Sequence, residues 1–247
     1  MVRRGAFIVL EGLDRSGKST QVTRLAEYLN DKGTKAANIN FPNRTTAVGS
    51  LINSYLQSDH ELDDAAVHLL FSANRWEAVT SLKARLNAGE TLVCDRYAFS
   101  GVAFTSAKGT LSLEWCKNPD RGLPAPDAVI YLDVTSDVAR QRCCYGEERY
   151  EKEEFQNKVR KVFETLRSED AGMWHVIDAS MSLDDVTSRV FCSLALCCIC
   201  LCSAYVLSVL TWSDVNQITQ IADCVIERAQ GLPLQKLWDG GNGGNGG

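Results

Sequence analysis

A glycine-rich segment near the start of the chain has the residue types that bind nucleotide phosphates. Residues 12–19 read Gly-Leu-Asp-Arg-Ser-Gly-Lys-Ser and match the spacing G-x-x-x-x-G-K-[ST]. Gly12 and Gly17 permit a tight turn whose backbone N–H groups point at phosphate oxygens. Lys18 brings a positive charge to the β- and γ-phosphates, and the Ser19 hydroxyl is the expected Mg²⁺ ligand. The loop predicts binding of a nucleoside triphosphate, although a kinase, a GTPase and an ATPase would share it.

Two charged residues inside this loop narrow its chemistry. Asp14 and Arg15 place a carboxylate and a guanidinium among the glycines. Arg15 could neutralise charge on the transferring phosphoryl group, as an arginine finger does. The alternative is a surface cation without a catalytic part.

A second charged cluster follows the apolar run at residues 91–95. Asp95 would lie at the carboxyl end of a strand, where it could hold Mg²⁺ or its waters. Arg96 could hold an anionic acceptor and neutralise charge in the transition state. The alternative is that Asp95 caps the next helix and pairs with Arg96.

An aromatic ring and a guanidinium share one face of a predicted helix. Phe71 and Arg75 are four residues apart within residues 63–88, which have a helical pattern. A stacking ring beside a forked donor suits recognition of a planar base. By composition alone, a core Phe and a solvated Arg are the commoner outcome.

Strand and helix patterns alternate along the chain and would position these groups. Apolar runs typical of strands occupy residues 6–11, 35–41, 91–95, 127–133 and 174–178, and helical patterns occupy residues 19–29, 63–88 and 151–166. Such alternation predicts an α/β fold with a parallel sheet covered on both faces. Ligands of these sheets bind beyond the carboxyl ends of the strands, where the motifs above fall.

Several segments together resemble the thymidylate kinases, and closely the eukaryotic branch of that family. They are residues 7–20, 41–44, 68–77, 95–104, 122–127, 148–151 and 232–238, in this order. The resemblance covers about residues 5–190 and 218–238. It implies a P-loop nucleoside-monophosphate-kinase fold with about five parallel strands and a short lid. It also implies phosphorylation of dTMP to dTDP by ATP and Mg²⁺, which supplies dTTP for DNA synthesis.

The resemblance assigns an acceptor site for dTMP. Phe71 stacks on thymine and Arg75 hydrogen-bonds the base, while Arg44 and Arg96 hold the phosphate. Asp14 takes the 3′-hydroxyl, Phe104 lies against the sugar, and Tyr150 and Gln156 close the site. The complete implied set is Asp14, Phe41, Arg44, Phe71, Arg75, Arg96, Ser100, Gly101, Phe104, Tyr150 and Gln156.

The resemblance assigns the donor site and the catalytic groups as well. The implied ATP site comprises Gly12, Asp14, Arg15, Ser16, Gly17, Lys18, Ser19, Thr20, Arg142, Asp178, Ala179 and Ser180, with Arg142 over the adenine. The implied catalytic residues are Arg15, Lys18, Asp95 and Arg96, and the implied metal ligands are Ser19 and Asp95. Arg15 places the chain in the branch whose P-loop supplies the catalytic arginine. Family members also pair as homodimers through the helix at residues 63–88.

Rival functions remain open. Deoxynucleoside kinases share the P-loop but differ at residues 95–97, and UMP/CMP kinases lack the Phe71 and Arg75 pair. A P-loop switch protein would need an Asn-Lys-x-Asp motif, which is absent. The net charge of −5 argues against a nucleic-acid partner.

An uncharged segment interrupts the pattern near the end of the chain. Residues 190–213 are long and apolar enough for a membrane helix. In the resembling kinases, the counterpart of residues 191–218 is missing, so we expect a single domain over residues 1–238 with an anomalous insertion. A retained intron or gene-model error is the preferred interpretation; a membrane anchor, a buried hairpin and an inactive isoform are the alternatives. Residues 239–247, rich in Gly and Asn, read as a flexible tail.

The beginning of the chain and its cysteines bear on location. Residues 6–10 are already strand-like, which leaves no room for a signal peptide. We therefore expect a cytoplasmic, or also nuclear, protein whose ten cysteines stay reduced, although an organelle form with a longer start stays open. The cysteine spacing does not match a zinc site.

Overall fold

A computed structural model describes most of the chain. It covers residues 4–58, 60–142, 150, 152–170, 172–190, 226, 229 and 232–238. The predictions for the insertion at residues 191–218, for the tail at residues 239–247 and for the centre of the lid at residues 143–149 lie outside the described residues.

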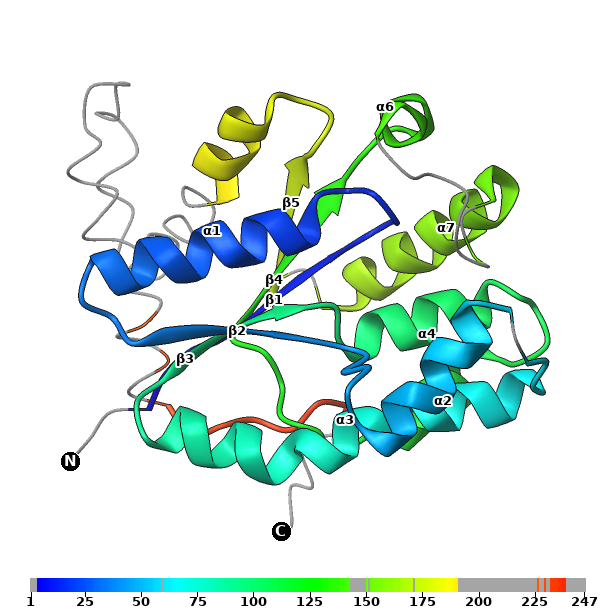
Figure 1. Ribbon diagram of the computed structural model, residues 1–247, viewed down its shortest axis with the longest axis horizontal. Helices are drawn as coiled ribbons and strands as arrows, with labels where there is room; N and C mark the ends of the chain where they lie inside the picture. Colours follow the sequence, from blue (N-terminus) through cyan, green and yellow to red (C-terminus); the bar gives the residue numbers. More distant parts are fainter. Residues whose placement is uncertain are drawn as a thin grey trace, which may run out of the picture.

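A five-stranded sheet forms the centre of the molecule (Figure 1). Its strands are β1 (Phe7–Gly12), β2 (Ala36–Asn40), β3 (Thr91–Asp95), β4 (Ala128–Asp133) and β5 (Trp174–Asp178), in the spatial order β2-β3-β1-β4-β5. All four neighbouring pairs are parallel, with Val9 opposite both Cys94 and Val129. The predicted fold class and the five strand positions are confirmed, with boundaries that shift by one residue in β1, β2 and β4.

Helices cover both faces of the sheet (Figure 1). On one face lies α1 (Lys18–Asp31), beside the helical residues 183–190. The opposite face carries α3 (Asp64–Asn87), α4 (Ala98–Ser106) and α7 (Glu153–Glu169). Burial on both sides explains why β1 and β4 are continuous apolar runs, with every residue of β1 buried.

Several short helices complete the chain and were not predicted from the sequence. They are α2 (Ala47–Leu56), α5 (Leu113–Lys117), the 3₁₀ turn at Asn118–Asp120 and α6 (Ser136–Gln141). The nine-residue α4 was not given a range either. The sequence did contain one signal for α2, because Thr46 is a favoured residue type at the start of a helix. In the structure, its hydroxyl accepts a hydrogen bond from the Gly49 N–H at 3.0 Å. Short helices carry too few periodic positions to stand out in a sequence.

The end of the described chain returns to the body of the domain. Leu237 N donates to the Leu123 carbonyl at 2.7 Å, and Gly122 N donates to the Leu237 carbonyl at 2.9 Å. The Leu237 side chain is part of the main hydrophobic core, and the Trp238 ring meets the Phe99 ring edge-on at 5.6 Å. Among the described residues, no helix has the length and apolar character needed to cross a membrane.

Candidate active site

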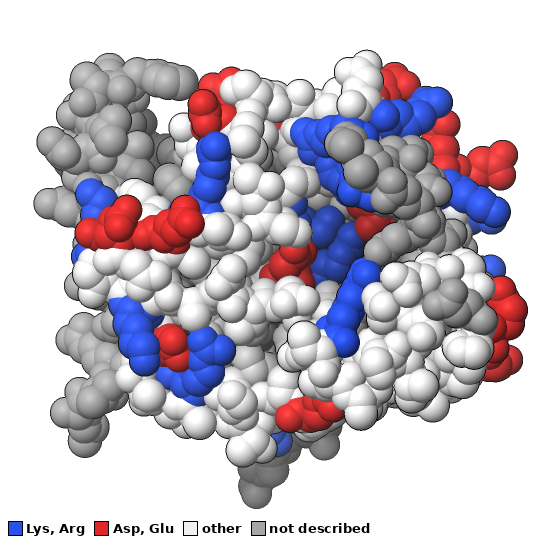
Figure 2. All heavy atoms as spheres, viewed as in Figure 1, with Lys and Arg blue, Asp and Glu red and all other residues white. Residues whose placement is uncertain are grey.

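A cavity of about 540 Å³ opens at the carboxyl ends of the strands. This volume suits a small-molecule ligand. Figure 2 shows acidic and basic side chains gathered in a recess on this face of the molecule. Seventeen predicted site residues line the cavity: Asp14, Arg15, Gly17, Lys18, Ser19, Thr20, Phe41, Arg44, Phe71, Arg75, Asp95, Arg96, Ser100, Gly101, Phe104, Arg142 and Tyr150.

A second cavity of about 420 Å³ adjoins the first and shares Gly17, Thr20 and Arg142 with it. Ser16 and Ala179 line this second cavity, together with apolar residues such as Val138 and Val186. The remaining predicted residues line neither cavity; they are Gly12, Gln156, Asp178 and Ser180.

The P-loop joins β1 to α1 and wraps around the ammonium group of Lys18. Gly12 and Gly17 have φ values of 148° and 93°, a region that favours glycine. Nζ of Lys18 donates to the Leu13 carbonyl at 2.6 Å and to the Ser16 hydroxyl at 3.2 Å. Burial and the nearby Arg96 charge lower the pKa of Lys18 to about 8. The loop therefore holds a buried cation that an anionic phosphate would stabilise.

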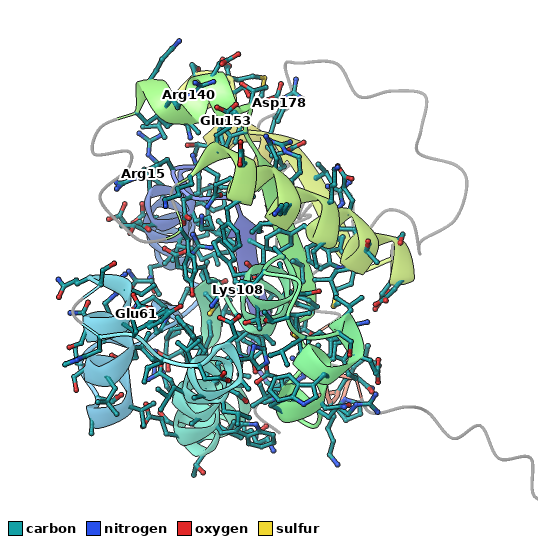
Figure 3. The ribbon with its side chains drawn as sticks, turned by 90° about the vertical axis from the view of Figure 1, so that its right-hand side faces the viewer. Arg15, Glu61, Lys108, Arg140, Glu153 and Asp178 are labelled. Carbon is teal, nitrogen blue, oxygen red and sulfur yellow. The ribbon has the colours of Figure 1, made fainter. Side chains whose placement is uncertain are left out.

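Arg15 lies in the same loop, with a φ of 61°. Figure 3 looks at the carboxyl edge of the sheet and shows Arg15 beside the start of α1, with Glu61 and Lys108 below it. Because Arg15 lines the same cavity as Lys18, two positively charged side chains of the loop face the same ligand space.

Ser19 and Asp95 place two oxygen ligands together at the floor of the cavity. The Ser19 hydroxyl donates a short hydrogen bond to Oδ2 of Asp95, which connects the first turn of α1 with the end of β3. Oxygen ligands of this kind suit Mg²⁺. The described residues contain no cluster of three or more His, Cys, Asp or Glu side chains that could hold a metal. A cation here would thus complete its coordination with phosphate and water oxygens.

Asp14, Arg96 and Gln156 form a hydrogen-bonded network, of which Asp14 and Arg96 line the cavity. Nη2 of Arg96 makes a short ion pair with Oδ1 of Asp14, and Nε2 of Gln156 donates to Oδ2 of Asp14 at 2.7 Å. Nη1 of Arg96 donates to the Ser100 hydroxyl at 3.2 Å. The Arg96 guanidinium also lies 5.3 Å from the centre of the Phe104 ring. These contacts hold Arg96 from three sides.

Glu11 orients this network from beneath, and sequence reasoning missed it. Its side chain is fully buried at the end of β1. Oε1 accepts from the backbone N–H of Tyr97 at 2.9 Å and of Ser100 at 3.1 Å, and Oε2 accepts from the Ser100 hydroxyl. Glu11 thereby caps α4 in place of a local residue. Burial raises the pKa of Glu11, against the lowering effect of the Ser100 hydroxyl and the Arg96 charge. The signal was a carboxylate at the end of an otherwise apolar strand.

The lining of the cavity also combines an aromatic ring with a buried guanidinium. Phe71 and Arg75 both line it, and Arg75 is only 2% exposed, because it forms an ion pair with the buried Asp120. The commoner outcome of a solvated arginine is therefore wrong. Gly101 faces the guanidinium closely: a Cβ at this position would lie 2.8 Å from Nη2 of Arg75.

Aromatic residues close one side of the cavity. The Tyr150 ring stacks on Phe155 at 5.3 Å and meets Phe104 edge-on at 5.6 Å. The Tyr150 hydroxyl donates to the Tyr55 hydroxyl at 2.9 Å, and the backbone carbonyl of Tyr150 accepts a hydrogen bond from Gln156. Tyr55 was not predicted, because nothing in the sequence placed α2 beside Tyr150.

Arg142 joins the two cavities. Nη1 donates to the Arg15 carbonyl at 2.5 Å, and Nη2 donates to the Ala179 carbonyl at 2.6 Å. The loop that contains Ala179 is shaped by Asp178, whose Oδ1 accepts from the Ser180 N–H at 2.9 Å. Figure 3 shows Asp178 at the same end of the molecule as Arg140 and Glu153, whose ion pair spans 3.3 Å between α6 and α7.

Comparisons with known proteins agree with this geometry. The family model described as thymidylate kinase matches residues 10–190. A thymidylate kinase of Danio rerio is 53% identical over 184 residues, which are 74% of this chain and 87% of that protein. A thymidylate kinase of Homo sapiens is 51% identical over 184 residues, with the same two shares. A solved thymidylate kinase of Candida albicans superposes with a TM-score of 0.71 at 37% identity, covering 77% of this chain and 91% of that one. This chain belongs to the thymidylate kinase family, whose members are nucleoside monophosphate kinases.

Proposed function

We propose that this chain transfers the γ-phosphoryl group of ATP to dTMP, forming dTDP for the synthesis of dTTP. The observation that carries the proposal is one cavity that is lined both by P-loop residues and by the Phe71 and Arg75 pair. A nucleoside monophosphate in this cavity would have its base at that pair and its phosphate near the P-loop.

Charge and alignment account for catalysis in this site. Phosphoryl transfer passes through a loose transition state, so positioning and charge neutralisation do most of the work. Lys18, Arg15 and Arg96 all line the cavity, and we infer that Lys18 and Arg15 would contact the donor phosphates while Arg96 would contact the acceptor phosphate. Closure by the lid would exclude water, which would otherwise accept the phosphoryl group.

Ser19 and Asp95 would hold Mg²⁺ at the donor phosphates. Their oxygens already meet at the floor of the cavity. When bound, the ion neutralises charge that develops on the phosphate oxygens. Asp95 would bind directly or through water, and Ser19 would bind through its hydroxyl.

The acceptor residues would each contact a different part of dTMP. Phe71 would stack on thymine, Arg75 would donate to the base, and Arg44 and Arg96 would hold the phosphate. The remaining proposed contacts are Phe41, Ser100, Gly101 and Phe104 along the nucleoside, Asp14 at the 3′-hydroxyl, and Tyr150 and Gln156 at the closing side.

The donor residues would likewise each contact a different part of ATP. Backbone N–H groups from Gly12 to Thr20 would bind the phosphates. Arg142 would cover the adenine, because its guanidinium bridges the P-loop and the loop at residues 178–180. The second cavity supports this placement, since its apolar lining suits a flat base.

A coupled assay of ADP release tests the proposal. Purified protein is supplied with ATP and Mg²⁺ and with dTMP, dUMP, dCMP, dGMP, UMP or thymidine in turn. We expect dTMP to give the highest kcat/KM. Preference for a nucleoside would indicate a deoxynucleoside kinase, and a folded protein inert toward dTMP would overturn the assignment.

We infer a single kinase domain over residues 1–238 interrupted at about residues 191–218, which a parallel assay of a form lacking those residues tests. A homodimer through α3 is supported by the exposed Leu69 and Trp76 on that helix, and light scattering tests it. A cytoplasmic or nuclear location stays a prediction.

A further inference from the structure

The guanidinium of Arg75 is held by a carboxylate that comes from a different part of the chain. Nε of Arg75 donates to Oδ1 of Asp120 at 3.1 Å, and Nη2 donates to Oδ2 at 2.6 Å. Arg75 is 2% exposed and Asp120 is 0% exposed. Two parallel hydrogen bonds of this type fix the plane of a guanidinium as well as its position.

The carboxylate of Asp120 is itself anchored. The Ser72 hydroxyl donates to Oδ1 of Asp120 at 2.7 Å and lies 3.1 Å from the Pro119 carbonyl. Ser72 is one turn before Arg75 on α3, so both partners of Asp120 come from one helix. The carboxylate cannot rotate without losing one of these contacts.

The other side of the guanidinium is confined by the backbone of α4. A Cβ at Gly101 would lie 2.8 Å from Nη2 and 3.1 Å from Nη1 of Arg75. Within the described part of the chain, Nη1 donates no hydrogen bond, although Arg75 lines the cavity. The two N–H groups of Nη1 and the second N–H of Nη2 are therefore left for a ligand.

The pairing also changes what this arginine can attract. A free guanidinium favours phosphate and carboxylate oxygens, whereas a guanidinium already paired with a buried carboxylate carries little net charge. Its remaining N–H groups suit a neutral carbonyl oxygen. An exocyclic amino group at the same place is a donor, so it would face another donor and leave Nη1 unpaired.

We propose that Asp120 is a positioning residue that makes Arg75 selective for a base with a carbonyl oxygen, a role that rests on the proposed function. Asp120 touches no substrate. It acts by fixing the plane of Arg75 and by neutralising its charge, so that the base end of the cavity prefers thymine over cytosine and does not compete for the phosphate.

The test compares Asp120→Asn with Asp127→Asn in the full chain. Asp127 is a matched control, because it forms a two-bond ion pair with Arg4 at 2.7 and 2.8 Å but does not line the cavity. For Asp120→Asn, we expect the KM for dTMP to rise about tenfold or more while kcat changes less than about threefold. The preference for dTMP over dCMP, as a ratio of kcat/KM values, falls by about tenfold. For Asp127→Asn, we expect both quantities to stay within about twofold of wild type.

Two further variants keep the proposal testable if Asp120→Asn folds poorly. Ser72→Ala removes the anchor of the carboxylate and should raise the KM for dTMP by about two- to fivefold. In an Arg75→Gln background, Asp120→Asn should cause no further rise in that KM, because the residue through which Asp120 acts is gone.

Binding of dTMP to each protein by calorimetry separates the possible failures. A wild-type protein that does not bind dTMP would overturn the proposed function and this role together. A wild-type protein that binds dTMP, beside Asp120→Asn and Ser72→Ala proteins with unchanged KM and unchanged preference, would overturn the role of Asp120 alone. Equal losses in Asp120→Asn and Asp127→Asn would also overturn it, since they would reflect general destabilisation.

Discussion

Gly101→Ala tests how closely α4 must approach the base end of the cavity. The added Cβ would lie 2.8 Å from Nη2, 3.1 Å from Nη1 and 3.3 Å from Cζ of Arg75. Ordinary van der Waals contact begins near 3.4 Å. The guanidinium would have to retreat by more than half an ångström, but the ion pair with Asp120 opposes that movement.

The magnitude follows from the hydrogen bonds that a displaced Arg75 would lose. A buried donor or acceptor that loses its partner costs about 1–3 kcal/mol, which corresponds to roughly a five- to one hundredfold change in an equilibrium constant. We therefore expect the KM for dTMP to rise within this range, while the KM for ATP stays unchanged. Overpacking should also lower the free energy of unfolding by about 1–3 kcal/mol.

The assay is steady-state ADP release over a range of dTMP concentrations, with urea unfolding measured in parallel. Gly172→Ala is the matched control, because its Cβ would meet nothing closer than 4.0 Å and its φ is not left-handed. A Gly101→Ala protein with a wild-type KM for dTMP would refute the reasoning, since it would show that Arg75 moves freely or does not contact the base.

Three further predictions concern the charges around the P-loop. First, kcat/KM for ATP should fall as the pH rises through about 8, because the buried Lys18 loses its proton there and then attracts the phosphates less. A kcat/KM that stays constant from pH 7 to 9.5 would contradict this. Second, burial raises the pKa of Glu11 above 4.5, so the wild-type protein should lose stability as the pH rises from 4.5 toward that raised pKa, whereas Glu11→Gln should lose less. Urea unfolding between pH 4 and 8 measures how the free energy of unfolding of each protein changes with pH. Parallel curves for the two proteins would count against the buried carboxylate. Third, Arg15→Ala should lower kcat by about a thousandfold with little change in the KM for dTMP, if Arg15 acts on the transferring phosphoryl group. A decrease of less than about tenfold in the single-turnover rate would indicate that another residue neutralises the charge of that group.

The features that the sequence determined by itself are local in the chain. The P-loop is one contiguous segment whose glycines, lysine and serine fix the path of the backbone, so residues 12–19 were sufficient to predict a phosphate site. The strands were equally readable, because a parallel sheet covered on both faces requires continuous apolar runs such as β1 and β4. The family resemblance added the acceptor residues, and most of them do line one cavity.

The features that only the tertiary structure decided depend on contacts between distant segments. Glu11 caps a helix that begins at Ala98, because β1 and β3 are neighbours in the sheet although α1, β2, α2 and α3 separate them in the chain. Asp120 forms an ion pair with Arg75 because the 3₁₀ turn packs against α3. No spacing rule links such residues, since the distance between them is set by the order of the strands and the packing of the helices. For the same reason, composition alone favoured a solvated Arg75, and only the structure showed that Arg75 is buried beside Asp120.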